Sequence, residues 1–397
     1  MRKTVSFCLL VCVFALSTGC KDTFNYEYRS TSVPLEQPPA QEELPFERAD
    51  NISDLKQRII DFIREGRELG EIRLYNYQGN INRDVSRVCQ QIMREEPIGA
   101  YLVDYMSPKY TALAGYTALR LTITYRSGRS QEDIRKVNNV RELTDEIDAA
   151  LRSFQSSLVV EVGYLPSDTD LTALTRDLYY REPARAVGLT AVSVALYPPD
   201  IDFKAGNGFA RIAEFTITYP AASDEMRTRA EAAEAALQAL ITDLPADLTP
   251  PYAALWLYDA LCASVSYDEE GAQALFNGEQ TEDDLYSALV EGRAVTSGYA
   301  LAYRRLCDLS GIQCRIVRGW RGNTEFIWNV IQLDGDWYHV AAAGDAASGA
   351  HDWFLKTDEE MRAQARWNTD STPRCESAQY TYDMLIQSPE EEPAIAR

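Results

Sequence analysis

Histidine is nearly absent from this 397-residue chain, which contains only His339 and His351. With only two imidazoles in the chain, the spacing of the eight cysteines fits no zinc ribbon or finger. The middle of the chain also lacks a Gly-rich phosphate loop and a paired-carboxylate signature. The sequence therefore predicts neither a metal site nor a cofactor.

Basic residues are too few to balance the acidic ones. The chain has 39 Lys and Arg against 60 Asp and Glu, which gives a formal charge of -21. Such a balance disfavours direct contact with nucleic acid or with anionic lipid headgroups. Solubility at a cell surface is the simpler interpretation of the excess of acidic residues.

Long apolar runs are missing except near the N-terminus. Arg2 and Lys3 precede an apolar run of about 12 residues, shorter than the roughly 20 residues of a membrane span. We interpret residues 1–19 as a secretory signal peptide. The small residues that end in Cys20 resemble the cleavage box of bacterial lipoproteins. This predicts a lipidated Cys20 that anchors the protein to the membrane outside the cytoplasm; an ordinary secretory peptide cut nearby is the alternative.

The segment after Cys20 has few large aliphatic side chains. Residues 20–50 contain Pro34, Pro38, Pro39 and Pro45. Polar, proline-containing chains of this kind cannot bury enough apolar surface to fold. About 30 such residues have a root-mean-square span on the order of 30 Å. The segment is therefore predicted to be a flexible tether that lifts a folded body off the membrane.

The middle of the chain repeats one pattern of strands and helices. Alternating β-branched and aromatic residues predict strands, and amphipathic charged stretches predict helices. In the first copy we expect strands at 71–77, 99–105 and 117–125 and helices at 55–67, 84–95 and 131–151. In the second copy we expect strands at 158–164, 188–196 and 210–219 and helices at 171–180 and 224–244. These orders predict two tandem βαββα units, over residues 51–154 and 155–246.

Two landmarks support the duplication. The segment Arg94–Pro97 returns in shortened form as Arg181–Pro183, and Leu121–Tyr125 returns as Phe215–Tyr219. Chance similarity between two amphipathic patterns is the alternative to shared ancestry. Several tyrosines of the two copies either line a binding face or pack half-buried on a sheet: Tyr77, Tyr101, Tyr105, Tyr110, Tyr179 and Tyr180.

The C-terminal third has a different pattern, beginning after the proline-rich boundary at Pro245–Pro251. The segment Ala294–Ala300, followed by residues with helical spacing, resembles the nucleophile turn of the bacterial transglutaminase-like, papain-related domains. The segments Trp328–Val330 and Trp337–Val340 resemble the strands that carry the base and the acid in that family. The resemblance implies a papain-like domain over residues 250–390 and an α+β chain as a whole.

The resemblance also implies that the catalytic triad is lost. Thr296 stands where active members of the family have the nucleophilic Cys, Phe326 where they have the base His, and Ala341 where they have the orienting Asp. A hydroxyl, a phenyl ring and a methyl group supply no thiolate, no proton acceptor and no carboxylate. The sequence therefore predicts a pseudoenzyme, in which Phe326 and Ala341 form an apolar patch beside Thr296.

Three functions remain open from the sequence. The first is a non-catalytic binding or scaffold module for a peptide, a glycan or another envelope protein, and the second is a structural spacer. The third is a hydrolase or acyl transferase whose catalysis has moved to Ser297 and His339, although His339 also fits a scaffold role.

In active members of the family the triad lies in a cleft, and residues near the equivalent positions of this chain are the candidates for ligand binding. They include an arginine, a hydroxyl and several aromatic side chains, a common combination at recognition sites. The candidates are Arg293, Ser297, Tyr299, Trp320 and Trp328. Core or surface packing is the alternative role for each of them.

An odd number of cysteines remains outside the signal peptide and Cys20. They are Cys89, Cys262, Cys307, Cys314 and Cys375. At least one must stay unpaired within a single chain. A disulfide among the last four suits an extracytoplasmic protein, and small buried side chains are the other interpretation.

Overall fold

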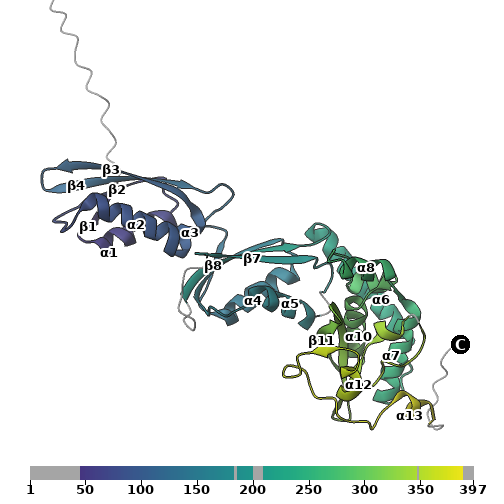
Figure 1. Cartoon of the computed structure of the whole chain (residues 1–397). Helices are drawn as coiled ribbons and strands as arrows, with labels where there is room; N and C mark the ends of the chain where they lie inside the picture. Colours follow the sequence, from purple (N-terminus) through teal and green to yellow (C-terminus); the bar gives the residue numbers. More distant parts are fainter. Residues whose placement is uncertain (1–44, 183–185, 200–208, 347, 388–397) are drawn as a thin grey trace, which may run out of the picture. The chain divides into compact units, whose positions relative to one another are not determined.

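The computed structural model describes residues 45–182, 186–199, 209–346 and 348–387. The described chain is α+β, as predicted, with helices packed on four-stranded sheets (Figure 1). The predicted signal peptide, the Cys20 lipidation site and most of the predicted tether lie outside the described residues. None of the described helices combines the length and the apolar character needed to cross a membrane.

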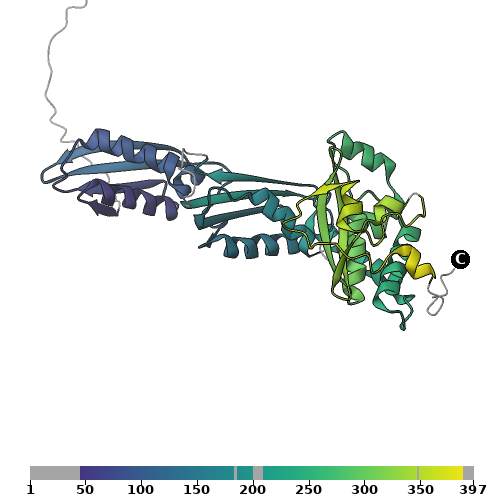
Figure 2. The same cartoon turned by 60° about the horizontal axis from the view of Figure 1, so that its bottom comes forward.

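The first sheet has the strand order β1-β2-β4-β3. Its strands are β1 (Phe46–Ala49), β2 (Leu69–Leu74), β3 (Val103–Leu113) and β4 (Tyr116–Tyr125). Helices α1 (Ile52–Arg64) and α2 (Ile81–Glu95) cover one face of this sheet (Figures 1 and 2). Helix α1 begins at Asn51, whose side chain accepts the backbone N–H groups of Ser53 and Asp54. Its buried residues Leu55, Ile59 and Ile63 recur at helical spacing and form one core with the strands.

The second sheet repeats the first in strand order and strand direction. Its order is β5-β6-β8-β7. Its strands are β5 (Ile134–Val137), β6 (Ser157–Leu165), β7 (Ala191–Tyr197) and β8 (Phe209–Thr218), and its helices are α4 (Val140–Arg152) and α5 (Leu171–Arg181). In each sheet the first two strands are parallel and the other pairs are antiparallel. The landmark segments ending at Tyr125 and Tyr219 lie on the equivalent strands β4 and β8.

The boundaries of the two units differ from the prediction. The predicted helix at 131–151 is strand β5 followed by α4; β5 pairs with β6 of the second sheet, and α4 packs against the same strand. The first unit therefore ends near Tyr125 rather than at residue 154. At the other end, β1 begins at Phe46, inside the predicted tether. The first unit thus gains the initial strand β1 before its predicted first helix, and the second unit gains both β5 and α4.

Two further elements differ from the prediction. The predicted strand at 99–105 begins as helix α3 (Pro97–Leu102), because a proline at the first helical position starts a helix as readily as it ends one. The predicted last helix of the second unit is α6 (Ser223–Thr242). It lies against helices of the C-terminal domain, and Glu234 on it pairs with Arg305 at 2.9 Å.

The C-terminal domain packs a long helix against a four-stranded sheet of order β13-β12-β11-β14. The helix is α10 (Ser297–Leu309), and the strands are β11 (Gln313–Arg321), β12 (Thr324–Leu333), β13 (Asp336–Val340) and β14 (Arg366–Trp367). The remaining elements are α7 (Pro250–Ser264), β9 (Ser266–Tyr267), α8 (Glu269–Phe276), α9 (Leu285–Leu289), β10 (Arg293–Ala294), α11 (Ala342–Asp345), α12 (Asp358–Arg362) and α13 (Tyr382–Gln387). The β12–β13 hairpin turns at Asp334 and Gly335, both with positive φ, and Asp-Gly is a favoured pair in such turns.

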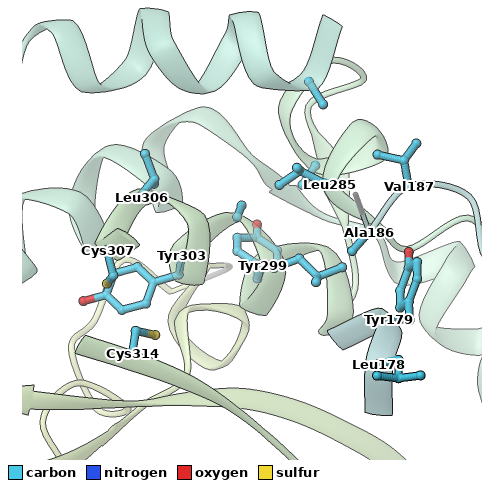
Figure 3. Packing of buried hydrophobic residues seen from close by; sticks show 14 of the residues in the cluster. Leu178, Tyr179, Ala186, Val187, Leu285, Tyr299, Tyr303, Leu306, Cys307 and Cys314 are labelled. Carbon is cyan, nitrogen blue, oxygen red and sulfur yellow. The ribbon is translucent and has the colours of Figure 1, made fainter. Parts of the chain in front are cut away.

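One hydrophobic core is shared by the second unit and the C-terminal domain. Figure 3 shows Tyr299, Tyr303 and Leu306 of α10, and also Tyr179 and Val187 of the second unit, which belong to the same buried cluster. The backbone N–H of Leu285 donates to the carbonyl of Ala186, 3.3 Å away. The boundary near residue 250 therefore separates two chain segments but not two cores.

All five cysteines within the described residues are unpaired thiols. The Cys307 thiol hydrogen-bonds with Cys314 in the core beneath α10, and burial raises the pKa of Cys307 well above its usual value (Figure 3). Cys89 and Cys375 are also buried. Among the described residues no disulfide forms. The structure thus supports the interpretation of these cysteines as small side chains that pack in or beside the core.

Candidate functional site

Thr296, Phe326 and Ala341 lie together although 45 positions separate the first from the last (341 − 296). Thr296 immediately precedes α10, and its hydroxyl oxygen accepts the backbone N–H of Ile327 at 3.4 Å. Phe326 lies on β12, and Ala341 directly follows the neighbouring strand β13. Phe326 and Ala341 share a buried apolar cluster, and Phe326 also lines a cavity together with Thr296.

Phe326 fills the space at its position with an aromatic ring. Its ring centroid lies 5.4 Å from that of Trp328 and 5.5 Å from that of Trp353. Ala341 is 2% exposed and donates its backbone N–H to the carbonyl of Trp353. Neither side chain can accept a proton or orient an imidazole, so this part of the site is packed and apolar.

The N-terminus of α10 is held by the half-buried carboxylate of Asp283. Asp283 Oδ1 accepts the backbone N–H groups of Val295 and Gly298 at 2.8 and 2.9 Å. Asp283 Oδ2 accepts those of Thr296 and Ser297 at 2.9 and 2.7 Å. A carboxylate has about four lone-pair sites, and here each of them has a donor.

This carboxylate changes the electrostatics of the turn. The free N–H groups of a helix N-terminus carry about half a positive charge, which favours an anion such as a thiolate. Asp283 occupies those groups and places its own negative charge beside residue 296. Burial raises the pKa of Asp283, and its four backbone N–H bonds oppose that shift. A nucleophile at position 296 would therefore meet a neutralised helix end.

Gly298 allows the carboxylate to approach this closely. A Cβ atom at position 298 would lie 2.8 Å from the Asp284 carbonyl oxygen and 3.0 Å from Asp283 Oδ1. Both distances are tighter than normal contacts, and the first involves backbone that cannot rotate away. The requirement for glycine at this turn is thus steric.

Two cavities meet at Thr296. The first, of about 320 Å³, is named here the Tyr180 cavity and is bounded by α5, the start of β7, the segment between α8 and α9, and Ser297. The second, of about 430 Å³, lies beside Tyr267, Arg321 and Phe326 and is named the Tyr267 cavity. Thr324 and Glu325 line both cavities, so together they form a cleft on either side of Thr296.

Polar side chains join the second unit to α10 across the Tyr180 cavity. The hydroxyls of Tyr180 and Ser297 lie 3.2 Å apart and share a hydrogen bond. Arg318 pairs with Asp177 of α5 at 3.2 Å and with Glu325 at 2.8 Å. Burial raises the pKa of Tyr180 to about 12, so the phenol stays protonated and cannot act as a base near neutral pH.

His339 is part of a different, buried network. Trp328 Nε1 donates to His339 Nδ1 at 2.9 Å, and an indole nitrogen can only donate. His339 Nε2 must therefore carry the proton, which it donates to Asp358 Oδ1 at 2.9 Å. Burial lowers the pKa of His339, although Asp358 opposes this, and the neutral ring has no free lone pair.

The thiol of Cys375 lies beside this pair. The ligand atoms of His339, Asp358 and Cys375 all fall within 4.8 Å of one another. A metal bound at His339 Nε2 would force the ring proton onto Nδ1. There it would point at the N–H of Trp328, so two donors would face each other and the hydrogen bond would be lost. Burial also raises the pKa of Cys375 strongly, which disfavours thiolate. The three residues therefore do not fit a metal ion in this arrangement.

The predicted binding residues are divided by the structure. Ser297 lines the Tyr180 cavity. Tyr299 and Trp328 are each 1% exposed and bond to Val265 and His339, so they lie in the core, which is the alternative role that the sequence left open for them. Trp320 is exposed, and Arg293 pairs with Asp268; neither lines the two cavities.

The predicted alternative pairing of Ser297 with His339 is not present. Within the described residues, Ser297 bonds to Tyr180, while both ring nitrogens of His339 are used by Trp328 and Asp358. Asp283 was missed by the sequence reasoning, because nothing in local spacing shows that it reaches α10. Tyr180 was recognised only as one aromatic residue among several.

Comparison with known proteins gives only distant likeness. No protein-family model and no curated protein matches the chain. A crystal structure of a TGase is 10% identical, with a TM-score of 0.28 and coverage of 63% of each chain. A structure described as a "putative cysteine protease" from Cytophaga hutchinsonii is 12% identical, with a TM-score of 0.24 over 39% of this chain and 65% of that one. The chain thus spans less than two thirds of either neighbour, and likeness at these scores carries no inference about activity.

Proposed function

We propose that this protein is a non-catalytic surface lipoprotein whose C-terminal domain binds a ligand in the cleft beside Thr296. The observation that carries the proposal is the contrast within that cleft. Phe326 and Ala341 are packed and apolar, whereas Thr296 borders two open cavities. A concave site with a few convergent polar groups is the usual form of a binding site.

The chemistry of the cleft supports binding without bond cleavage. A threonine hydroxyl becomes a nucleophile only with an adjacent base. In the described chain, Thr296 and Ser297 hydrogen-bond to backbone groups, to the Asp283 carboxylate and to the Tyr180 phenol. No histidine is among these partners, so neither hydroxyl has an imidazole base beside it. In this proposal Thr296, Phe326 and Ala341 are the degenerate triad positions of a transglutaminase-like domain.

The cluster of His339, Asp358 and Cys375 needs a separate explanation, because it combines a thiol, an imidazole and a carboxylate. The proposal treats it as structural. His339 has no nitrogen free to accept the thiol proton, and both Cys375 and His339 are fully buried. A Cys375→Ser variant should therefore leave any measured activity unchanged.

Membrane attachment is the other part of the proposal. It rests on the signal-like N-terminus and on Cys20 at the end of its small-residue segment. Metabolic labelling with a radioactive fatty acid should mark the wild-type protein and fail to mark a Cys20→Ser variant. Labelling that persists in the variant would contradict anchoring through Cys20.

Assays of thiol-protease, transglutaminase and amidase activity test the catalytic part. The wild-type protein should show none, and Ser297→Ala should match it. Activity that disappears in Ser297→Ala would contradict the proposal. A Cys375→Ser variant assayed in parallel separates a contribution of the buried cluster from one of the cleft.

A cysteine placed at position 296 tests the electrostatics of the turn. The thiol of Thr296→Cys should have no lowered pKa, because Asp283 holds the N–H groups that would stabilise a thiolate. The added change Asp283→Asn should lower that pKa by about one unit, which corresponds to about 1.4 kcal/mol. The pH dependence of alkylation by iodoacetamide measures both values, and circular dichroism checks the fold.

Photo-cross-linking tests whether the cleft binds a ligand. A photoreactive residue at Glu279 or Thr324, both of which line the cleft, should form adducts when the intact protein is exposed to cell-envelope extract. Glu231, exposed on α6, is the matched control position and should form none. Adducts at all three positions or at none would contradict a binding cleft and favour a spacer.

A further inference from the structure

The edge strands of the two repeated sheets are protected differently. Strand β3 forms the edge of the first sheet and carries Asp104, Pro108 and Lys109. Charged residues and proline on an edge strand are common means of preventing another strand from pairing there. Strand β7 occupies the equivalent edge of the second sheet, and its sequence Ala-Val-Ser-Val-Ala-Leu-Tyr contains neither a charge nor a proline.

The β7 edge is also accessible. No residue of β7 is buried, and β8 is its only strand partner within the described part of the chain. Val192, Val194 and Leu196 are only partly buried against the shared core. The strand thus offers unpaired backbone groups on one side and apolar side chains at every second position, which are the two requirements for strand addition.

The edge leads into the cleft. Thr190, Ala191 and Val192, at the start of β7, line the Tyr180 cavity that also contains Thr296 and Ser297. A peptide paired along β7 would therefore place one end in this cavity. The seven residues of β7 correspond to roughly 23 Å of extended chain.

The charges around the Tyr180 cavity indicate which charge the entering end of the peptide would carry. Five carboxylates line it against two guanidinium groups, Arg176 and Arg318. Arg318 is already paired with Glu325 and Asp177. Glu279 has no side-chain partner among the described residues and is exposed. A Lys or Arg side chain would be complementary to this rim, whereas an acidic one would be repelled.

From these observations we propose that β7 accepts an extended peptide by strand addition, with a basic residue of the peptide entering the Tyr180 cavity next to Glu279. The strand-addition proposal rests on the proposed binding function and adds the class of ligand. The ligand would be a peptide with alternating apolar residues and a Lys or Arg at the end that enters the cavity. The packed positions Phe326 and Ala341 take no part in it.

Defined peptides test the proposal with the intact protein. Three fluorescein-labelled peptides share the sequence Thr-Val-Thr-Ile-Ser-Val-Asn and differ only in carrying Lys, Glu or Ser at both ends, so that the same residue meets the cavity in parallel or antiparallel pairing. Fluorescence anisotropy should show the Lys peptide binding at least about tenfold more tightly than the Glu peptide. N-methylation of alternate amides in the Lys peptide should reduce its affinity by at least about tenfold, because main-chain hydrogen bonds provide the affinity of strand addition.

Variants locate the binding edge. The exposed residues Ser193 and Ala195 become lysines in the β7 variant Ser193→Lys/Ala195→Lys, which should weaken binding of the Lys peptide at least about tenfold. The matched β3 variant Thr111→Lys/Leu113→Lys should leave it unchanged. Glu279→Lys should weaken it, and Glu231→Lys should not. Equal effects in the β3 and β7 variants, or full binding of the N-methylated peptide, would overturn the proposal.

Two outcomes distinguish this proposal from the one on which it rests. If the cleft forms photo-adducts but the three peptides do not bind, strand addition is wrong and the binding cleft stands. If the cleft forms no adducts and the peptides do not bind, both are wrong. If the protein self-associates in sedimentation and the β7 variant abolishes this, the edge pairs with a second copy, and the peptide proposal is overturned.

Discussion

The two repeated units share their construction and differ in what they contact. Asn51 and Asn139, 88 positions apart (139 − 51), cap α1 and α4 in the same way, each accepting two backbone N–H groups. Gly66 and Phe154 follow those helices at the same offset, and both have positive φ. The equivalent turns thus keep their conformation even where a phenylalanine replaces the glycine that this conformation favours.

The differences lie on the surfaces of the two units. The first unit has a core built almost wholly from its own residues and an edge strand protected by charge and proline. The second unit shares its core with the C-terminal domain and has an unprotected edge. The first unit has a closed surface, and the second forms part of the wall of a cleft. Equal topology therefore does not imply equal function.

Truncating the two cores should produce the largest effects. Ile59 and Ile147 are equivalent and fully buried, so Ile59→Ala and Ile147→Ala should each lower the free energy of unfolding by about 2–5 kcal/mol. All six tryptophans lie beyond residue 250, so their fluorescence reports on the C-terminal domain. Urea unfolding followed by fluorescence should shift strongly for Ile147→Ala and little for Ile59→Ala. Equal fluorescence shifts would show that the cores are not separate.

An ion cluster on the first sheet should give a smaller, pH-dependent effect. Glu71 bonds to Arg73 at 3.0 Å and Arg120 at 3.1 Å, whereas Val159 occupies the equivalent position of the second sheet. Burial alone would raise the pKa of Glu71, but these two guanidinium groups outweigh it and lower the pKa below 4.5. The resulting stability is present above pH 4.5 and is lost as the pH falls through the lowered value.

The variant Glu71→Gln tests this cluster. It should cost about 1–2 kcal/mol at pH 7, because hydrogen bonds to a charged group are lost, and almost nothing at pH 2. Chemical denaturation at both pH values measures the difference. Val159→Ala, measured in parallel, should show no such pH dependence, and a constant cost of Glu71→Gln would rule out an ionised Glu71 as the source.

The two helix caps should cost the same when removed. Asn51→Ala and Asn139→Ala each leave two backbone N–H groups without their side-chain acceptor, at a cost of about 1 kcal/mol. Differential scanning calorimetry measures both. A difference between them well above 1 kcal/mol would show that the second cap is coupled to the C-terminal domain.

Removing the protection of β3 should have the smallest effect on stability. Pro108→Thr with Lys109→Val should change the free energy of unfolding by no more than about 0.5 kcal/mol, since surface substitutions rarely do more. It should, however, make the β3 edge resemble that of β7. Sedimentation velocity should then show increased self-association. Unchanged association would mean that Pro108 and Lys109 do not protect this edge.

Elements with strong local signals could be predicted from the sequence. Alternation of β-branched and aromatic residues identified β4 and β8, and Asp334–Gly335 is a local turn signal of the same kind for the β12–β13 hairpin. The short parallel strand β5 was merged into a helix because its four residues are followed directly by α4, and a four-residue strand has little periodicity of its own. Pro97 was taken for a helix end, although proline is equally suited to a helix start.

The sequence by itself determined the helix caps, the strands β4 and β8, the hairpin turn and the absence of a thiol, an imidazole and a carboxylate at positions 296, 326 and 341. Each of these depends on a residue type or on spacing over a few positions. Only the tertiary structure decided that Asp283 holds the start of α10, that Tyr180 meets Ser297 across a cavity, and that His339 is locked between Trp328 and Asp358. These contacts join segments 11 to 117 positions apart. Their geometry is set by how sheets and helices pack, which local spacing does not specify.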